Sequence, residues 1–500
     1  MSQTVSYNDF VIRFANVNGS GSASANGMFA KALFRMGVPV ATRNIFPSNI
    51  QGLPTWFEVR VNEQGYLGRR EGVDIMVAMN AETYAEDVAS LKPGGFLVYD
   101  NSKPLARSLK RSDITEIGIP LATMLLPEFS DQKQRGLFKN ITYLGALTAL
   151  LNIEFEVITG MVATQYKGKD ALIAPNIHAL ELGRQYAMDY LPCPLPLQVR
   201  RSDANGDKIM IDGNAAAALG ALYGGATVCA WYPITPSTSV AEAFEQYANQ
   251  LRIDSATGQR KFAVVQAEDE LSAIGIVIGG AWNGARSFTA TSGPGISLMS
   301  EFLGLAYFAE IPAVVMDIQR AGPSTGMPTR TQQADLLSAG YASHGDTKHV
   351  MLFPSTPKEC FDQSALALDL ADRLQTPVLL MSDLELGMND VMSEPLTWDE
   401  ERKYDRGKVL SKDDLDEVER FGRYLDTDGD GIGYRTYPGT HPEKGAFFTR
   451  GTSRNEYAAY TESPEVYEQN MQRLEQKWAT AATLVPPAEI QQTGQRAGII

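Results

Sequence analysis

The feature that most constrains this chain is a repeated alternation of short apolar runs with segments of helical apolar period. It extends from Ile209 to about Leu386 and also runs through the first 195 residues. Short runs that are apolar throughout are typical of strands buried on both faces of a parallel sheet. The alternation therefore predicts an α/β fold with two successive doubly wound domains.

The expected elements follow from this alternation. In the first domain we expect strands at 10–14, 74–78 and 95–99 and helices at 25–36 and 169–190. In the second domain we expect strands at 228–231, 262–266, 287–290, 313–318, 349–353 and 377–381, with helices at 270–285 and 297–308 among them.

Domain boundaries are indicated by prolines and by changes in composition. Residues 192–196 contain alternating prolines, which exclude regular helix there. We predict a first domain over 1–195, a linker over 196–207 and a second domain over 208–390. Residues 391–485 are charged and aromatic, which predicts an irregular connecting arm with one helix near 463–480. The apolar end of the chain predicts that residues 486–500 begin a further α/β domain.

The charge of the chain excludes one large class of partners. Its net charge is -15 and its pI is about 4.9, whereas binding to nucleic acid requires basic patches. No apolar run reaches the roughly 18–20 residues that span a bilayer. The N-terminus also lacks a basic segment followed by an apolar stretch. We therefore expect a cytoplasmic protein without membrane contact.

Cysteine usage limits the metal chemistry of this chain. It contains only Cys193, Cys229 and Cys360, and no two of them are spaced as Cys-x-x-Cys. A four-cysteine iron–sulfur or zinc site cannot be built from this chain alone. We predict no metal site here and interpret the cysteines as small apolar residues.

The strongest candidate for a functional residue is Glu270. It follows the expected strand at 262–266 and begins a helix of small and apolar residues. An acid in a first helical turn is often only a partner of the helix dipole. Beside an apolar helix junction, however, such an acid can have a raised pKa and can hydrogen-bond a ligand.

Two glycine- and proline-rich loops follow neighbouring strands, at 289–295 and at 319–326. Ligands of open α/β sheets bind outside the carboxyl ends of the strands, and glycine lets the backbone approach a ligand closely. Arg320 in the second loop could clamp a carboxylate, because the guanidinium fork matches both oxygens. An isolated arginine is more often part of a surface ion pair.

Two other motifs carry less weight. Gly19 and Gly21 resemble part of a dinucleotide fingerprint, but Ser24 replaces the third glycine and no acid follows the next strand, which favours a simple strand-to-helix turn. The run at 426–431 lacks the final glutamate of a calcium loop. It also lacks the strand and helix that hold a diphosphate, so we interpret it as an acidic turn.

Several segments together resemble the 2-oxoacid:ferredoxin oxidoreductases. Residues 232–237 read Tyr-Pro-Ile-Thr-Pro-Ser, and similar segments of the family match 211–216, 289–295 and 319–329. Residues 46–52 resemble the Tyr-Pro-Ser-x-Ile-Arg-Gly segment of the γ module of this family, with Gln51 in place of the arginine. The resemblance spans most of the chain. It indicates a γ module fused ahead of an α module, closest to the α subunit of 2-oxoglutarate:ferredoxin oxidoreductases.

The resemblance implies a role for each site residue. The first domain would be γ-like and the second would bind the pyrimidine of thiamine diphosphate. Glu270, Gly275 and Gly279 match the Glu-x-x-x-x-Gly-x-x-x-Gly helix of the family better than Glu268 does, so Glu270 would be catalytic, as the partner of pyrimidine N1′. Substrate would be bound by Tyr232, Thr235 and Arg320, and cofactor by Pro233, Ile234, Thr289, Ser292 and Gly293.

The resemblance also implies a partner. Thiamine diphosphate with Mg²⁺ would be shared with a β subunit that carries a [4Fe-4S] cluster, coenzyme A would be a substrate, and ferredoxin would accept electrons. A dimer of αβ heterodimers is expected.

The reaction expected is oxidative decarboxylation of 2-oxoglutarate to succinyl-CoA and CO₂. Pyruvate or branched-chain 2-oxoacids remain alternative substrates. A lipoamide-linked dehydrogenase, a non-catalytic assembly subunit and an NAD-binding oxidoreductase are alternative functions.

Overall fold

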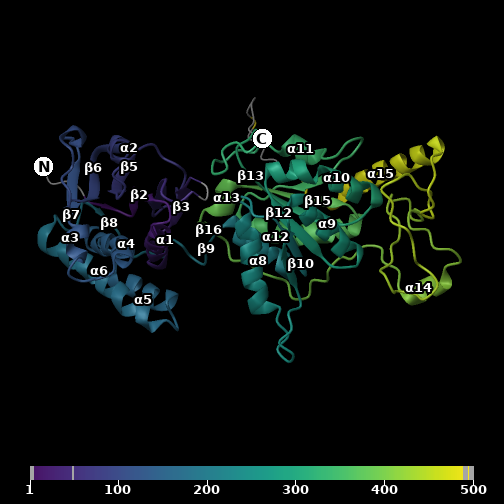
Figure 1. The fold of residues 1–500 in the computed structure, drawn as a ribbon, viewed down its shortest axis with the longest axis horizontal. Helices are drawn as coiled ribbons and strands as arrows, with labels where there is room; N and C mark the ends of the chain where they lie inside the picture. The colour runs from purple at the N-terminus through teal and green to yellow at the C-terminus, as the bar shows by residue number, and fades with distance from the viewer. Residues whose placement is uncertain (1–4, 48–49, 488–493, 495–500) are drawn as a thin grey trace.

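The protein is described by a computed structural model that covers residues 5–47, 50–487 and 494. Figure 1 shows an N-terminal α/β body beside a larger central one, with an extended arm on the far side of the latter. Residues 48 and 49 of the γ-like segment, and nearly all of the predicted further domain at 486–500, lie outside the described residues. The domain boundaries given above stay predictions.

The N-terminal body is built on a six-stranded sheet of order β3-β4-β2-β5-β6-β7. Strands β2, β5, β6 and β7 are parallel, whereas β4 pairs antiparallel with both β2 and β3. The main strands are β2 (Asp9–Val17), β3 (Val40–Ile45), β4 (Pro54–Asn62), β5 (Val73–Ala78), β6 (Leu91–Asp100) and β7 (Thr115–Ile119). The strands β3, β4 and β7 are absent from those expected from the sequence.

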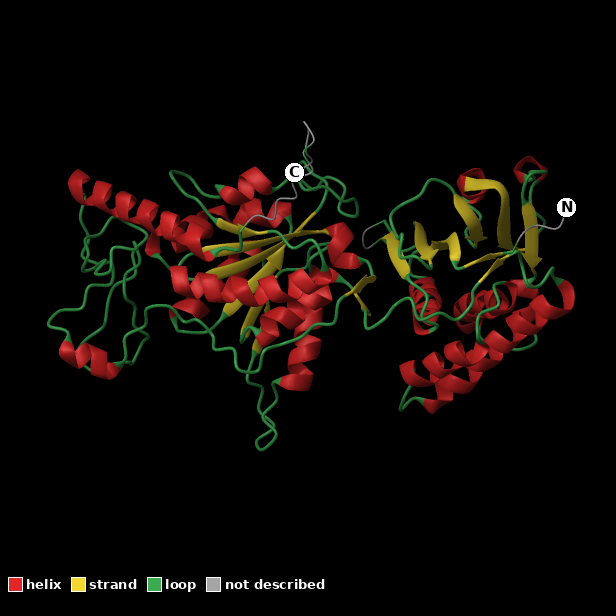
Figure 2. Ribbon diagram, turned by 180° about the vertical axis from the view of Figure 1, so that it is seen from behind, coloured by secondary structure: helices red, strands yellow, loops and turns green. Residues whose placement is uncertain are grey.

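The helices of this body lie mainly on one face of its sheet (Figure 2). Alternate residues of β2 explain the arrangement, because Phe10, Ile12 and Phe14 enter the larger core under the helices and Ala15 enters a smaller core on the other face. The helices are α1 (Ser22–Arg35), α2 (Tyr84–Ser90), α3 (Leu121–Leu125), α4 (Gln132–Leu150), α5 (Phe155–Gln165) and α6 (Asp170–Tyr190), with a 3₁₀ turn at Arg107–Leu109.

The central body contains a fully parallel six-stranded sheet of order β11-β10-β12-β13-β15-β14. Its strands are β10 (Val228–Trp231), β11 (Ala263–Gln266), β12 (Ser287–Thr291), β13 (Ala313–Gln319), β14 (Val350–Leu352) and β15 (Pro377–Asp383). All six were expected, with ends that differ by at most two residues. The fold class predicted from the sequence is thus confirmed.

Helices cover both faces of this sheet. One core includes residues of α7, α8 and α12, and the core on the other face includes residues of α9 and α10. The helices are α7 (Gly213–Tyr223), α8 (Thr238–Leu251), α9 (Glu270–Trp282), α10 (Gly293–Ala309), α11 (Leu336–Gly340), α12 (Pro357–Leu374) and α13 (Leu384–Met388). None of the helices in the described part of the chain is long and apolar enough to cross a membrane.

Two short two-stranded sheets lie outside the main sheets. β1 (Ser6–Tyr7) pairs with β8 (Leu197–Gln198), and β9 (Ile209–Ile211) pairs with β16 (Val391–Ser393). The N-terminal body also contacts the chain after α13 directly, since Thr42 N donates to the carbonyl of Asp390 (3.1 Å) and Asn44 N donates to Asn389 Oδ1 (2.8 Å).

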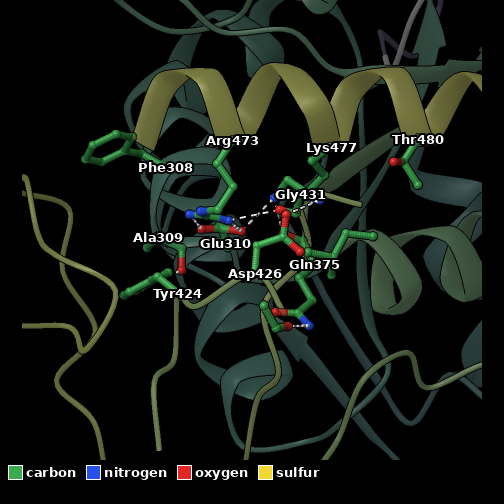
Figure 3. Close-up of polar contacts among 12 residues, drawn as sticks. Phe308, Ala309, Glu310, Gln375, Tyr424, Asp426, Gly431, Arg473, Lys477 and Thr480 are labelled. Carbon is green, nitrogen blue, oxygen red and sulfur yellow. Dashed lines mark hydrogen bonds and ion pairs between the residues drawn. The ribbon is translucent and has the colours of Figure 1, made fainter. Parts of the chain in front are cut away.

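The arm carries α14 (Lys412–Glu417) and α15 (Pro464–Leu484) and is otherwise irregular. It is anchored on one fully buried acid, Glu310, which lies just after α10 (Figure 3). Arg454 Nη2 (3.2 Å), Arg473 Nη1 (2.9 Å) and Lys477 Nζ (3.1 Å) from the arm donate to its carboxylate. Arg423 Nη2 donates to its backbone carbonyl at 2.6 Å. These cations hold the arm against the central body.

Candidate functional site

The candidate site lies at the carboxyl edge of the central sheet. Because all strands of this sheet are parallel, the segments that follow them emerge at one edge. The segment 232–236 follows β10, Glu270 follows β11, residues 292–295 follow β12 and Arg320 follows β13. Every predicted site residue except Thr289 therefore follows a strand end.

Glu270 is the first residue of α9. The side chain of Asp269, the residue before it, accepts a hydrogen bond from Ser272 N (2.6 Å) and caps the helix. The cap leaves Glu270 free to point inward, and only 6% of its surface is exposed. Residues of α9 that follow it, such as Ile274 and Val277, belong to the core. The chain thus holds a carboxyl group at a buried helix N-terminus.

Gly295 in α10 determines how close that helix comes to Glu270. A Cβ atom at Gly295 would lie 1.9 Å from Thr291 Oγ1 and 3.0 Å from Glu270 Cγ. No side chain fits there, so the start of α10 packs directly against the acid. Thr291 is fully buried at the end of β12. The three residues form a tight wall on one side of the site.

Arg320 is nearly buried and joins two loops. Its Nη1 donates to the carbonyl of Thr235 (2.6 Å) and its Nη2 donates to the carbonyl of Thr325 (3.2 Å). Burial lowers the pKa of its guanidinium, and the charges of Asp335 and Glu270 oppose that shift. Arg320 therefore lies within electrostatic reach of Glu270. Its contacts with two carbonyl oxygens were not expected from the sequence.

The other predicted residues differ in accessibility. Tyr232 and Pro233 are exposed, whereas Ile234 and Thr235 are half-buried. Gly293, half-buried, begins α10.

Thr289 is fully buried inside β12, two residues before the strand end, and Ser292 is fully buried in front of α10. Neither Thr289 Oγ1 nor Ser292 Oγ has a hydrogen-bond partner among the described residues.

Two acids at this edge were missed by sequence reasoning. Asp317 lies in β13, directly opposite Thr291 of β12, and is fully buried. Asp335 lies in the loop before α11, and its Oδ1 is 2.5 Å from where a Cβ of Gly293 would be. The signal for Asp317 was available, since it is the one charge inside the otherwise apolar strand 313–318.

The weaker motifs have local structural roles. Gly21 has a left-handed conformation (φ 77°) just before α1, and Asn140 Nδ2 donates to the carbonyl of Ser20 (2.8 Å), which makes this a packed turn. The Asp426 carboxylate accepts hydrogen bonds from the backbone of Gly429 and Gly431 (both 2.9 Å).

No cluster of three or more potential metal ligands of the His, Cys, Asp and Glu types occurs among the described residues. Cys229 and Cys360 are buried and Cys193 is half-buried.

Comparison with known protein families places the chain in a class of thiamine diphosphate-binding oxidoreductases. Residues 219–470 match the family described as pyruvate flavodoxin/ferredoxin oxidoreductase, thiamine diphosphate-binding, and residues 11–186 match the family described as pyruvate ferredoxin/flavodoxin oxidoreductase. The chain belongs to the 2-oxoacid:ferredoxin oxidoreductase family, in which it is an α subunit.

Individual relatives support the same assignment. Subunit alpha of 2-oxoacid:ferredoxin oxidoreductase 2 from Aeropyrum pernix is 31% identical, over 96% of this chain and 80% of the relative. The 2-oxoglutarate synthase subunit KorA of Methanothermobacter thermautotrophicus is 44% identical over 36% of this chain and 46% of its own length. A structure of the 2-oxoglutarate:ferredoxin oxidoreductase from Magnetococcus marinus, with 2-oxoglutarate, coenzyme A and succinyl-CoA bound, superposes with a TM-score of 0.84. It is 29% identical, and the match covers 98% of this chain and 82% of that one.

Proposed function

We propose that this chain supplies the pyrimidine-activating half of a thiamine diphosphate site that oxidatively decarboxylates 2-oxoglutarate with coenzyme A. The observation that supports this most is the convergence of buried Glu270 and Arg320 at one sheet edge, close enough for their charges to interact. The carboxyl group of Glu270 suits the activation of a cofactor, and the guanidinium of Arg320 suits the binding of a carboxylate.

The residues at this edge fit the aminopyrimidine of thiamine diphosphate. Glu270 offers a buried carboxyl group, and the buried hydroxyls of Thr289 and Ser292 have no partner among the described residues. Gly295 keeps the wall beside Glu270 free of a side chain. Thiamine diphosphate, when bound, supplies the electron sink for loss of CO₂ from a 2-oxoacid.

The chain's own contribution is positioning and proton control. Glu270 would accept or share a proton at pyrimidine N1′, while Pro233, Ile234 and Gly293 would line the cofactor. Arg320 would bind a substrate carboxylate with the N–H groups left after its contacts to Thr235 and Thr325.

The assignment of 2-oxoglutarate rests on Arg320 and on the relatives. A cation at this position suits a substrate with a second carboxylate. The KorA relative is named a 2-oxoglutarate synthase subunit, and the superposable Magnetococcus marinus enzyme has 2-oxoglutarate bound. Pyruvate and branched-chain 2-oxoacids are the alternatives, because the partner subunit would line the same pocket.

The remaining parts of the site would come from a β subunit. We propose that it holds the diphosphate with Mg²⁺ and a [4Fe-4S] cluster, which passes the two electrons to ferredoxin. Four cysteines for such a cluster are not present in this chain, which has three. A dimer of αβ heterodimers in the cytoplasm is the assembly we expect.

The test is to purify the αβ complex from its source cell and to replace Glu270 by Gln. We expect a brown complex that contains thiamine and reduces ferredoxin with 2-oxoglutarate and coenzyme A faster than with pyruvate. Glu270→Gln should lower turnover roughly 100-fold or more. Glu268→Gln is the matched control, because Glu268 is exposed and lies two residues earlier.

Two results would contradict the proposal. A colourless homo-oligomer without thiamine would exclude the thiamine site altogether. Unchanged turnover of Glu270→Gln in the reconstituted complex would instead favour a non-catalytic assembly subunit.

A further inference from the structure

The interface between the arm and the central body buries more positive than negative charge. Among the described residues, five buried cations lie at this interface against two buried acids. The cations are Arg286, Arg423, Arg435, Arg454 and Lys477, and the acids are Glu310 and Asp372. A buried charge that lacks a counter-charge is costly, so a further anion would stabilise this interface.

Arg423 is the least compensated of these cations. Only 3% of its surface is exposed, and its Nη2 donates to the backbone carbonyl of Glu310 (2.6 Å) rather than to a carboxylate. Its Nε and Nη1 are buried and have no hydrogen-bond partner among the described residues. The rings of Tyr424 and Phe447 lie 5.0 and 5.6 Å from the guanidinium, which provides attraction but no acceptor in the guanidinium plane.

Arg435 is a second cation with an unused donor. Its Nη2 donates to Asp372 Oδ1 and to the carbonyl of Arg406, both at 2.9 Å, whereas its buried Nε has no partner in the described part of the chain. Burial lowers the pKa of Arg423, and the charge of Arg435 lowers it further. The two guanidinium groups therefore lie within electrostatic reach of each other.

Both arginines line one small cavity between the arm and the central body. Its volume is about 10 Å³, which is room for a single small particle and not for a polyatomic ligand. Thr449 also lines it, and the Oγ1 of this residue accepts a hydrogen bond from Trp282 Nε1 at 2.5 Å. The hydroxyl proton of Thr449 therefore remains to be donated to a ligand.

Glu310 lines the same cavity, but its negative charge is already compensated. Its carboxylate accepts hydrogen bonds from Arg454 (3.2 Å), Arg473 (2.9 Å) and Lys477 (3.1 Å), as Figure 3 shows for Arg473 and Lys477. The donors that remain at the cavity are those of Arg423, Arg435 and Thr449. Three positive or neutral donors without an acceptor define a site for an anion.

The cavity is separate from the candidate active site. It is lined by Ala281 and Trp282 at the last turn of α9, whereas Glu270 is the first residue of that helix. At a rise of about 1.5 Å per residue, the two ends of α9 are about 18 Å apart. A ligand in this cavity would act on the arm and not on the chemistry at Glu270.

We propose that this cavity binds one single-atom anion, chloride, between the guanidinium groups of Arg423 and Arg435, and that the anion holds the arm against the central body. Chloride accepts several hydrogen bonds at once and needs little space. It would receive bonds from the unpartnered N–H groups of both arginines and from the hydroxyl of Thr449. The proposal does not rest on the proposed function, because no step of it involves thiamine or a 2-oxoacid.

The site is tested by crystallography of the purified complex with bromide in place of chloride. We expect one anomalous difference peak in the cavity between Arg423 and Arg435, and no peak there in Arg423→Gln. A cavity that is empty or holds a water molecule, in crystals that show bromide elsewhere, would overturn the proposal. This measurement needs no turnover.

The effect on the arm is tested by limited proteolysis of the same complex, with chloride replaced by gluconate at constant ionic strength. Chloride at about ten times its dissociation constant should slow cleavage of the arm about tenfold, because only the docked arm binds the anion. Arg423→Gln should lose this dependence. Arg402→Gln is the matched control, because Arg402 is a half-buried arm cation that pairs with Asp369 at 2.6 Å and does not line the cavity. It should keep the dependence.

Thr449→Val keeps the test decisive if Arg423→Gln does not fold. Valine preserves the shape of threonine and removes one donor, so about fivefold more chloride should be needed for the same protection. An unchanged chloride requirement in this variant would overturn the proposal. So would equal loss of the chloride dependence in Arg402→Gln, which would indicate general screening of charge. A bromide peak without any protection of the arm by chloride would show an adventitious ion only.

Discussion

Arg320 Nη1 donates a 2.6 Å hydrogen bond to the backbone carbonyl of Thr235, and this contact joins the loops that follow β10 and β13. Both residues were predicted to bind substrate, and they lie 85 positions apart in the sequence. A second bond, from Nη2 to the carbonyl of Thr325, fixes the plane of the guanidinium. The arginine therefore arranges the loops as well as offering charge.

This double role predicts that Arg320→Lys is not a mild substitution. An ammonium group cannot reach both carbonyl oxygens in the fork geometry of a guanidinium, although the positive charge is kept. We expect KM for the 2-oxoacid to rise roughly tenfold, corresponding to the loss of one charge-assisted hydrogen bond. Steady-state kinetics of the αβ complex measure the change. A KM equal to that of wild type would show that charge alone matters here.

Gly295→Ala should damage the site without unfolding the chain. The new Cβ would lie 1.9 Å from Thr291 Oγ1 and 3.0 Å from Glu270 Cγ, so α10 must shift away from Glu270. We expect thiamine binding to weaken at least about tenfold, as for a misplaced catalytic group. Calorimetric titration of the complex with thiamine diphosphate measures it.

The control for this substitution is Gly136→Ala. Gly136 is an exposed residue inside α4 with nothing within 4 Å of a Cβ, and alanine there should stabilise the helix by about 0.5–1 kcal/mol. If Gly295→Ala bound thiamine diphosphate as tightly as wild type does, the packing of α10 against Glu270 would not matter for cofactor binding.

The central sheet was predictable because its strands are short, apolar and separated by helices. The same pattern gave the carboxyl edge and therefore placed Glu270, Arg320 and the glycine-rich loops together. In the N-terminal body the strand β4 was missed, since it pairs antiparallel with β2 and mixes charged with apolar residues. Its assignment depends on long-range pairing that local periodicity does not reveal.

The contacts of the site were less predictable than its location. The position of Asp335 beside Gln319 at the end of β13 depends on how the loop before α11 folds back, and no spacing in the sequence encodes it. Likewise, the arm was expected to be irregular, but its buried anchor at Glu310 was not foreseen. That acid follows α10 directly and lies 144 residues before Arg454, the nearest arm residue along the chain that donates to its carboxylate.

Glu310→Gln should strongly destabilise the docked arm. The carboxylate is fully buried, and burial opposes its ionisation, but Arg473 and Lys477 outweigh that effect and hold its pKa well below the usual range. Removing the charge leaves buried cations uncompensated, at a cost of about 3–5 kcal/mol. Urea unfolding and limited proteolysis of the arm measure this loss.

The matched control is Glu301→Gln, on the exposed side of α10, the helix that Glu310 follows, and it should change stability by less than about 0.5 kcal/mol. The carboxylate of Glu310 also predicts an acid limit to stability. Its contribution is present above pH 4.5 and is lost as the pH falls toward its lowered pKa in the folded protein. Equal sensitivity of the Glu310 and Glu301 variants to protease would contradict the anchoring role.

Lys477 gives a second pH dependence of stability, in the alkaline range. Burial lowers the pKa of its ammonium group to about 8, against the attraction of Glu310. Between pH 8 and 10.5 the unfolded chain therefore binds more protons at this position than the folded chain, so the contribution of Lys477 to stability rises with pH. At about 1.4 kcal/mol per pH unit the gain is about 3 kcal/mol. Comparison with Lys477→Met isolates the contribution of Lys477. The difference in unfolding free energy between wild type and variant should shift in favour of wild type over this pH range. A constant difference would show that Lys477 stays charged.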